Sequence, residues 1–226
     1  MRKMIIALAA AASLLALGAT AAQASVSARP DATPACGGQC INIYSRLLGR
    51  DTILNAYVAG DRGVGGKVGQ KLNLHFASNT HPNEDFTLAA DGTASQFCGT
   101  ELARTSVACL HYSGSEVLEL NWTPYGNETD LCAGTAGPIF SGESVTLQRC
   151  GVHEGTLFIA DSDHATDGYV PVIDGADASF SHPEVITVDP GTTHPTNQLK
   201  VETENTLTGG VIRDSQLFSG WPGPAA

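Results

Sequence analysis

The alternation of apolar and polar residues along this chain predicts a fold made mainly of short β-strands. Residues 71–76, 116–122, 144–148 and 183–189 each alternate in this way, and residues 53–58 are rich in strand-forming types. Alternation with a period of two is typical of strands that bury one face. No segment beyond the N-terminal region keeps an apolar period of 3.6 residues over three helical turns. The pattern therefore predicts an all-β protein.

Turn-forming residues separate these segments. They cluster at residues 60–69, 91–92, 125–127, 134–137, 174–175 and 209–210. Many short strands joined by Gly-rich turns are typical of a β-sandwich or a β-barrel.

A strand-borne phenylalanine recurs along the chain and indicates a threefold repeat. Phe86, Phe158 and Phe218 are separated by 72 and 60 residues, each close to a third of the chain without its leader. Regular recurrence of this kind is a mark of internal repetition.

The N-terminus reads as an export signal. Arg2 and Lys3 precede an apolar run from Met4 to Leu17, and a small-x-small cleavage motif ends at Ala24. The run is shorter than the roughly 20 apolar residues that span a bilayer. We therefore expect a cleaved signal peptide at residues 1–24, a flexible lead-in at 25–35, one domain at 36–226, and a secreted protein.

The charge of the expected mature chain is strongly acidic. Removal of Arg2 and Lys3 leaves 10 basic against 23 acidic residues, a net charge of −13. Binding of phosphate-rich surfaces requires basic side chains. The composition thus excludes a nucleic-acid partner and, once the signal is removed, a membrane partner.

All six cysteines lie after the predicted cleavage site, as expected for disulfides in an oxidising compartment. Six cysteines allow 15 pairings. We predict bonds between sequential neighbours because each closes a short loop: Cys36–Cys40, Cys98–Cys109 and Cys132–Cys150. No pair has C-x-x-C spacing, so no zinc-finger site is predicted.

The central segment resembles one repeat of a ricin B-type β-trefoil lectin. Its letters LCAG…GESVTLQRCGVHEGTLFI (residues 131–159) combine a Cys-led strand, a Gly turn, an alternating strand ending in Cys, and a variant of the Q-x-W strand. The chain as a whole also resembles secreted proteins of streptomycetes. The resemblance implies a β-trefoil of three pseudo-repeats with a closed six-stranded barrel, which agrees with the all-β pattern.

The family's sugar contacts transfer unevenly to the three repeats. An active repeat has an Asp on its first hairpin strand, an aromatic platform on the second, and an Asn-Gln pair before the Trp. In the central repeat these positions hold groups that make no such contact: Gly134, Gln148, Gly155 and Thr156. The resemblance implies that this repeat is a scaffold only.

The first and third repeats keep polar groups at these positions. The first offers Asn55, His75 at the platform, and the pair Asn83-Glu84. The third repeat offers Asp189, Glu202 at the platform, and the pair Ser215-Gln216. The predicted carbohydrate-binding residues are Asn55, His75, Asn83, Glu84, Asp189 and Gln216, with ordinary surface polarity as the alternative.

Two further segments carry no predicted site. The acidic run 161–167 lacks the Gly turn and terminal Glu of an EF-hand loop and is predicted to be a solvated loop. The Gly-rich run 60–69 lacks the Ser or Thr that follows Gly-Lys in a phosphate-binding loop.

Three functions remain. The resemblance favours a secreted, non-catalytic, monomeric module that binds an extracellular glycan through its first and third repeats. The alternatives are a protease inhibitor or protein-interaction module using loops 60–69 and 98–109, the latter with Arg104, and a hydrolase with an unrecognised carboxylate site. No G-x-S-x-G or H-E-x-x-H motif is present. We therefore expect no enzymatic activity, no cofactor and no metal.

Overall fold

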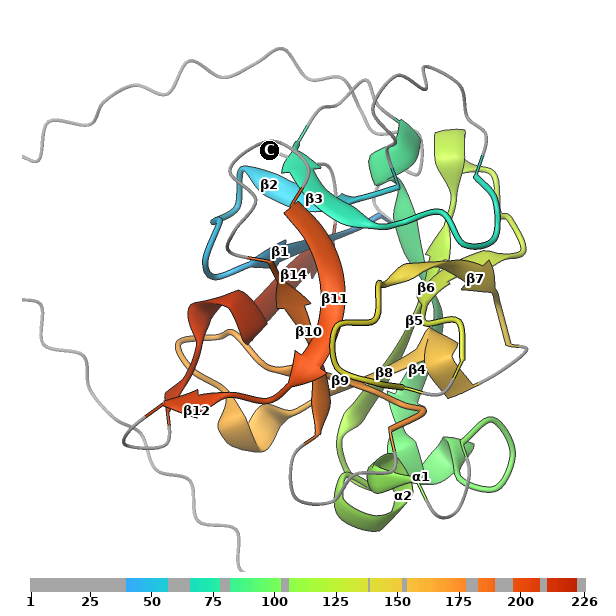
Figure 1. The fold of residues 1–226 in the computed structure, drawn as a ribbon. Helices are drawn as coiled ribbons and strands as arrows, with labels where there is room; N and C mark the ends of the chain where they lie inside the picture. The colour runs from blue at the N-terminus through green and yellow to red at the C-terminus, as the bar shows by residue number, and fades with distance from the viewer. Residues whose placement is uncertain are drawn as a thin grey trace, which may run out of the picture. The chain divides into compact units, whose positions relative to one another are not determined.

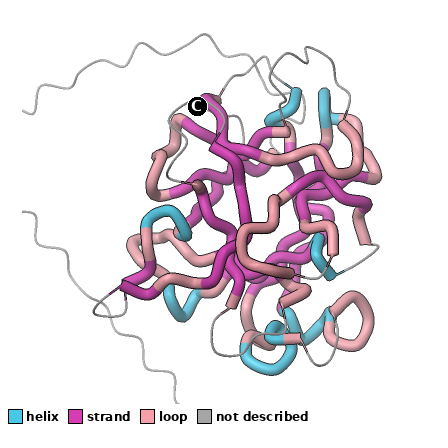
Figure 2. Tube along the Cα trace, viewed as in Figure 1, coloured by secondary structure: helices cyan, strands magenta, loops and turns pink. Residues whose placement is uncertain are grey.

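The chain folds as an all-β structure in the residues that the computed structural model describes. These are residues 40–56, 66–77, 82–102, 106–137, 139–151, 154–177, 183–189, 197–207 and 211–222, all within the compact unit Asp31–Ala226. Strands and loops make up most of this part (Figures 1 and 2), and its two α-helices, α1 (Ala94–Phe97) and α2 (Val107–His111), are short. The predicted fold class is confirmed.

The strands and one-turn 3-10 helices follow the chain in a regular order. The strands are β1 (Ile41–Ser45), β2 (Thr52–Asn55), β3 (Asn73–Phe76), β4 (Phe86–Thr93), β5 (Glu116–Trp122), β6 (Leu131–Gly134), β7 (Thr146–Arg149), β8 (Leu157–Ala160), β9 (Val172–Asp174), β10 (Glu184–Val188), β11 (Asn197–Thr203), β12 (Thr206–Leu207), β13 (Val211–Ile212) and β14 (Phe218–Pro222). The 3-10 helices are η2 (Pro82–Glu84), η3 (Pro124–Gly126), η4 (Glu154–Thr156), η5 (Ser162–His164) and η6 (Asp214–Gln216). The predicted strand 116–122 coincides with β5, and the other predicted strands agree within three residues.

Strands from the beginning and end of each repeat form a closed barrel. β1 pairs with β14, β4 with β5, β5 with β8, and β8 with β9, all antiparallel. A bridge from Val170 to Phe218 joins the start of β9 to β14, and β4 lies against β1 to complete the ring. Hydrogen-bonded pairing covers the strand edges along this ring, except between β4 and β1, which are in contact without a ladder.

The remaining long strands form three antiparallel hairpins: β2–β3, β6–β7 and β10–β11. Their second strands meet in a ring of backbone hydrogen bonds. The Leu72 N–H donates to Val145 O (2.9 Å), Val145 N–H to Leu199 O (2.9 Å), and Leu199 N–H to Leu72 O (3.1 Å). This ring marks an approximate threefold axis, and a barrel capped by three such hairpins is a β-trefoil.

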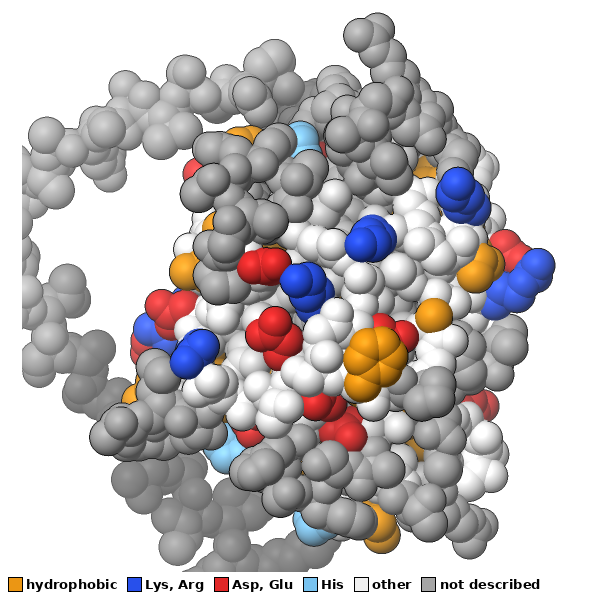
Figure 3. Space-filling model, in the orientation of Figure 1, with side chains coloured by type: hydrophobic (Ala, Val, Ile, Leu, Met, Phe, Trp, Pro, Cys, Tyr) orange, Lys and Arg blue, Asp and Glu red, His pale blue; other side chains and the backbone are white. Residues whose placement is uncertain are grey.

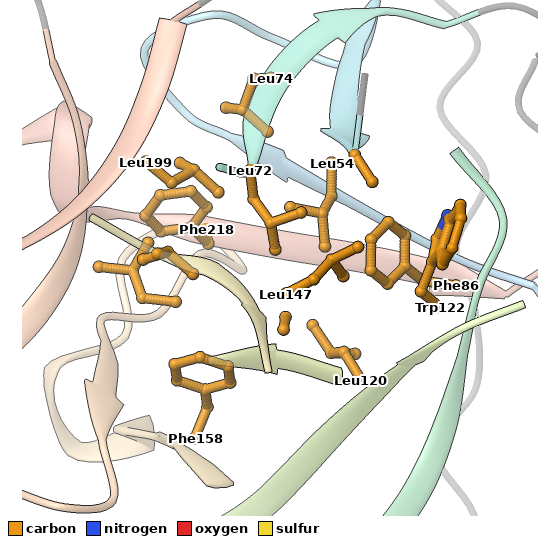
Figure 4. Close-up of a cluster of buried hydrophobic side chains, with 14 of the residues drawn as sticks. Leu54, Leu72, Leu74, Phe86, Leu120, Trp122, Leu147, Phe158, Leu199 and Phe218 are labelled. Atoms are coloured by element: carbon orange, nitrogen blue, oxygen red, sulfur yellow. The ribbon is translucent and has the colours of Figure 1, made fainter. Parts of the chain in front are cut away.

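The three recurrent phenylalanines occupy equivalent positions in the hydrophobic core. Phe86, Phe158 and Phe218 each follow a 3-10 helix by two residues and begin or nearly begin β4, β8 and β14. All three rings are fully buried and surround Leu72 and Leu147 in one cluster (Figure 4). The threefold repetition predicted from their spacing is confirmed.

Two of the predicted disulfides are confirmed. Cys98–Cys109 links the residue that follows α1 to the middle of α2, and Cys132–Cys150 links β6 to the residue that follows β7. Cys40 also takes part in a disulfide, but Cys36 lies outside the described residues, so the Cys36–Cys40 pairing stays a prediction. The domain boundaries at residues 24 and 35 lie outside the described residues as well.

The predicted turn at Asp91-Gly92 is wrong. Both residues lie inside β4, where Asp91 pairs with Leu118 and Gly92 with Val117 of β5. Pairing with a long neighbouring strand overrides the local preference of the Asp-Gly dipeptide. A register shift between Leu88 and Ala90 bends the strand there.

The described helices are also too short to be membrane spans. None of them has the length and apolar character that crossing a bilayer requires.

Candidate functional site

The ring of hydrogen bonds at the threefold axis fixes which positions of the three repeats are equivalent. The position three residues after each ring member is occupied by His75, Gln148 and Glu202. These are the three positions predicted for the aromatic platform. His75 and Glu202 are partly exposed, whereas Gln148 is buried and donates to Thr146 Oγ1.

The hairpin register corrects one predicted site residue in the third repeat. Asn55 lies opposite Asn73 and Gly134 lies opposite Thr146, each one residue past a ring member. The residue opposite the corresponding position of the third repeat, Lys200, is Thr187 and not Asp189. Asp189 lies after the end of β10, where its carboxylate pairs with the Lys200 ammonium at 2.8 Å.

Two of the predicted sugar contacts of the first repeat bond to each other inside the fold. Asn55 Nδ2 donates to Glu84 Oε1 at 3.2 Å, which ties the β2–β3 hairpin to η2. The two residues are 1% and 6% exposed. Asn55 and Glu84 therefore act as an internal link, which is a correction to their predicted role as direct sugar contacts.

Gln216 makes the corresponding link in the third repeat. It is 2% exposed, and its Nε2 donates to Thr187 Oγ1 and to Thr203 O, both at 3.1 Å, while its Oε1 accepts the Asn205 N–H. The full use of the side-chain amide inside the protein corrects its predicted role in sugar binding. The residue at the Gln position of this repeat thus joins the β10–β11 hairpin to η6 through hydrogen bonds.

Gly134 shows why the central repeat has lost the same pair. A Cβ atom at this position would lie 2.6 Å from Gly155 O and 3.1 Å from Thr156 Cα. The β6–β7 hairpin thus packs directly on η4. Where the other repeats have a hydrogen bond between the hairpin and the 3-10 helix, Thr156 Oγ1 here donates to Glu119 Oε1 at 2.8 Å. Close packing at Gly134, with no side chain at the Asp position, agrees with the predicted scaffold role.

Gly134→Ala is expected to lower the free energy of unfolding by about 1–3 kcal/mol, because the added methyl group overpacks the contact with η4. Gly137→Ala in the same hairpin loop is a matched control, since a Cβ there meets no atom within 4 Å. Urea denaturation of both variants measures the difference. Equal stability of the two variants would contradict the packing described for Gly134.

His75 and Asn83 are the predicted first-repeat contacts that remain partly exposed. His75 lies opposite Ile53 in the hairpin and on the same face as Asn55, because directly opposed residues and residues two apart point to the same side of a strand pair. On this face Ile53 and Asn55 are buried. The carbonyl oxygen of Asn83 accepts the Ala56 N–H at 2.9 Å. The structure therefore brings His75 and Asn83 to the same hairpin as the buried Asn55–Glu84 pair.

The helix η2 also positions an aromatic ring that the sequence analysis missed. η2 contacts η3, and Asp85 Oδ2 accepts the backbone N–H of Tyr125 at 3.1 Å. Burial raises the pKa of Asp85 to about 6, although the Tyr125 N–H opposes this effect. Tyr125 has a left-handed backbone (φ 56°), and its side chain is 56% exposed. The backbone of this exposed ring is held in a conformation that non-glycine residues adopt only rarely.

Only indirect signals in the sequence pointed to Tyr125. It stands in the turn cluster 125–127, and its partner Asp85 directly follows the predicted Asn83-Glu84 pair. Asp85 and Tyr125 are 40 positions apart in the sequence, so no local pattern shows their contact.

The segments invoked for the other predicted functions are only partly described. Residues 60–65 and Arg104 lie outside the described residues. On the face drawn in Figure 3, hydrophobic side chains are scattered and acidic and basic groups are interspersed. Among the described residues visible on that face, the apolar side chains do not join into one continuous patch.

The acidic run 161–167 differs from the predicted solvated loop at its first residue. Asp161 is fully buried and caps η5, where its Oδ1 accepts the Asp163 N–H at 3.0 Å. Its Oδ2 lies 2.6 Å from His164 Nδ1. Hydrogen bonding to Asp161 raises the pKa of His164.

Comparison with known proteins gives the fold. No protein-family model and no curated protein matches the chain. The designed threefold-symmetric protein ThreeFoil matches with a TM-score of 0.50 at 10% identity, over 80% of this chain and 96% of that one. The cytolethal distending toxin of Haemophilus ducreyi matches with a TM-score of 0.48 at 10% identity, over 83% of this chain and 85% of the toxin chain. The likeness to ThreeFoil supports the β-trefoil fold and carries no function with it.

Proposed function

We propose that this chain is a secreted, non-catalytic module that binds carbohydrate at η2 and at the adjoining part of the β2–β3 hairpin around His75. The contacts in this proposal are His75, Asn83 and Tyr125. The buried pair Asn55–Glu84 supports them and does not itself touch the sugar. The two described disulfides are in keeping with an extracellular location.

The observation that carries the proposal is the position of η2 between two separate parts of the chain. Glu84 of η2 bonds to Asn55 of the hairpin, and the next residue, Asp85, bonds to the Tyr125 amide of η3. Asn83 of η2 is thereby held next to both elements. A fixed aromatic ring, an amide and an imidazole thus belong to one linked group of elements.

These three groups have the chemistry that sugar recognition requires. The face of a tyrosine ring covers the apolar C–H groups of a pyranose. The Asn side chain both donates and accepts hydrogen bonds, and an imidazole does the same in its neutral form. Each group therefore suits a hydroxyl-rich, uncharged ligand.

A glycan array probed with the labelled mature chain tests the proposal. We expect binding to a subset of neutral glycans. Tyr125→Ala is expected to weaken binding to the best glycan by about 2- to 10-fold, the loss that corresponds to one aromatic contact. His75→Ala and Asn83→Ala are expected to weaken it as well, with the melting temperature of each variant measured alongside.

Two variants control for effects that have nothing to do with the site. Glu202→Ala removes the third-repeat equivalent of His75, and Phe140→Ala removes a 63% exposed ring from the β6–β7 loop. Both are expected to bind as the wild type does. A wild-type chain that binds no glycan, or controls that lose as much affinity as the site variants, would overturn the proposal.

A further inference from the structure

A second group of polar side chains gathers far along the chain from η2. Asp161 directly precedes η5, which follows β8, His164 is the last residue of η5, and Glu204 follows β11. One donor atom from each of the three residues lies within 4.8 Å of the other two. The fold thus joins residues from the second and third repeats into one cluster.

We propose that Asp161, His164 and Glu204 form a binding site for a transition-metal dication of the Zn²⁺ type. Zn²⁺ binds nitrogen and oxygen donors at about 2.0–2.2 Å. Donors on neighbouring corners of the tetrahedral site are about 3.4 Å apart. The three donors therefore need shifts of only about 1 Å or less to surround an ion.

The donor set selects the class of metal. One imidazole and two carboxylates are ligands that suit Zn²⁺ and neighbouring transition metals, whereas Ca²⁺ requires six to eight oxygens. His164 Nδ1 lies 2.6 Å from Asp161 Oδ2, so a metal would take the place of the proton that these atoms share. The His164 side chain is half exposed, which leaves room for water at the remaining coordination positions.

The backbone around the cluster is held in place by hydrogen bonds. The Asp161 N–H donates to Pro171 O at 3.0 Å, and the Glu204 N–H donates to Pro183 O at 2.8 Å. The Asp163 N–H fixes the second carboxylate oxygen of Asp161 at 3.0 Å. Bonds of this kind orient metal ligands before the ion arrives and tune their affinity.

The surroundings of the cluster carry a strong negative field that a dication would offset. Burial first, and then the charges of Asp161, Glu204, Asp163 and Asp177, raise the pKa of Tyr112 to about 12. Among the ion pairs of the described residues, Asp161 pairs with His164 alone. The field and the geometry of the donors therefore favour the same kind of ligand.

Calorimetric titration of the chelator-treated mature chain with ZnCl2 tests the site. The expected result is one Zn²⁺ bound per chain and a higher melting temperature with excess Zn²⁺. Glu204→Gln and His164→Ala are each expected to lower the affinity by at least about tenfold, since each removes a ligand. His164 and Glu204 lie outside the fully buried core, so both variants are expected to fold. Asp161 is fully buried, and its replacement would disturb the fold itself.

The controls separate a built site from general attraction to an acidic protein. Asp130→Asn removes an exposed carboxylate that pairs with Arg149 elsewhere on the surface, and it is expected to keep the wild-type affinity. CaCl2 at the same concentration is expected to leave the melting temperature unchanged. The site is refuted if the wild type binds no Zn²⁺, if both ligand variants bind it as the wild type does, or if Ca²⁺ stabilises the chain equally well.

Discussion

Replacement of Phe86, Phe158 or Phe218 by alanine is expected to lower the free energy of unfolding by about 3–5 kcal/mol in each case. Each ring is fully buried in the same cluster around the threefold axis. Removal of a buried ring loses its transfer free energy and leaves a cavity that the neighbouring strands fill only in part. Because the three rings occupy equivalent positions, the three losses are expected to agree within about 1 kcal/mol.

Denaturant unfolding of the three variants measures these losses, with Phe140→Ala as the control. Phe140 is 63% exposed, so its replacement is expected to change the free energy of unfolding by no more than about 0.5 kcal/mol. A single ring whose removal costs as little as that of Phe140 would contradict the equivalence of the three repeats.

Asp174→Asn is expected to raise the free energy of unfolding at pH 8 by at most about 4 kcal/mol. Burial raises the pKa of Asp174 from 3.8 to about 7, and each pKa unit corresponds to about 1.36 kcal/mol. The carboxylate accepts from Thr135 Oγ1 and from the Ala176 N–H, both at 2.9 Å. An asparagine keeps both bonds, because its amide donates to the Thr135 hydroxyl and its oxygen still accepts from Ala176.

The pH dependence of this difference identifies its cause. Below about pH 4 Asp174 is protonated in the folded and unfolded chains alike, so wild type and variant are expected to be equally stable. Between about pH 4 and pH 7 the unfolded chain releases a proton that the folded chain still holds, so the wild type loses stability as the pH rises. The loss levels off above about pH 7.

Thermal or urea unfolding of both proteins from pH 4 to pH 8 gives this curve. Asp130→Asn is the matched control, because its exposed carboxylate is replaced without any change in a buried group. A constant difference between wild type and Asp174→Asn at all pH values would show that packing, and not the buried charge, separates them.

Much of the fold could be predicted from the sequence because each repeat buries the same kinds of residue. The alternation of residues 116–122 matches β5, and the spacing of the three phenylalanines indicates the threefold repeat. The helices α1 and α2 could not be predicted from periodicity, since each spans little more than one turn. They are held by the Cys98–Cys109 bond, which was predicted.

The candidate sites depended on register and on long-range contacts that the sequence does not show. The predicted strand 183–189 places Asp189 at the acidic position of the third repeat, but the pairing with β11 makes Thr187 the equivalent of Asn55. Asn55 and Glu84 are buried and bond to each other across 29 positions of the sequence, a contact that no local pattern shows. Glu204 lies 40 residues beyond His164, so only the folded chain brings them together.

The most direct test of the carbohydrate site is a titration of the ¹⁵N-labelled mature chain with its best-binding glycan, followed in amide NMR spectra. We expect changes in amide chemical shift at His75, Asn83 and Tyr125 and at their neighbours in β3, η2 and η3. We expect no changes in the β10–β11 hairpin or η6, because Gln216 there is hydrogen-bonded within the fold. Changes confined to the third repeat, or their absence throughout the chain at saturating glycan, would contradict the account.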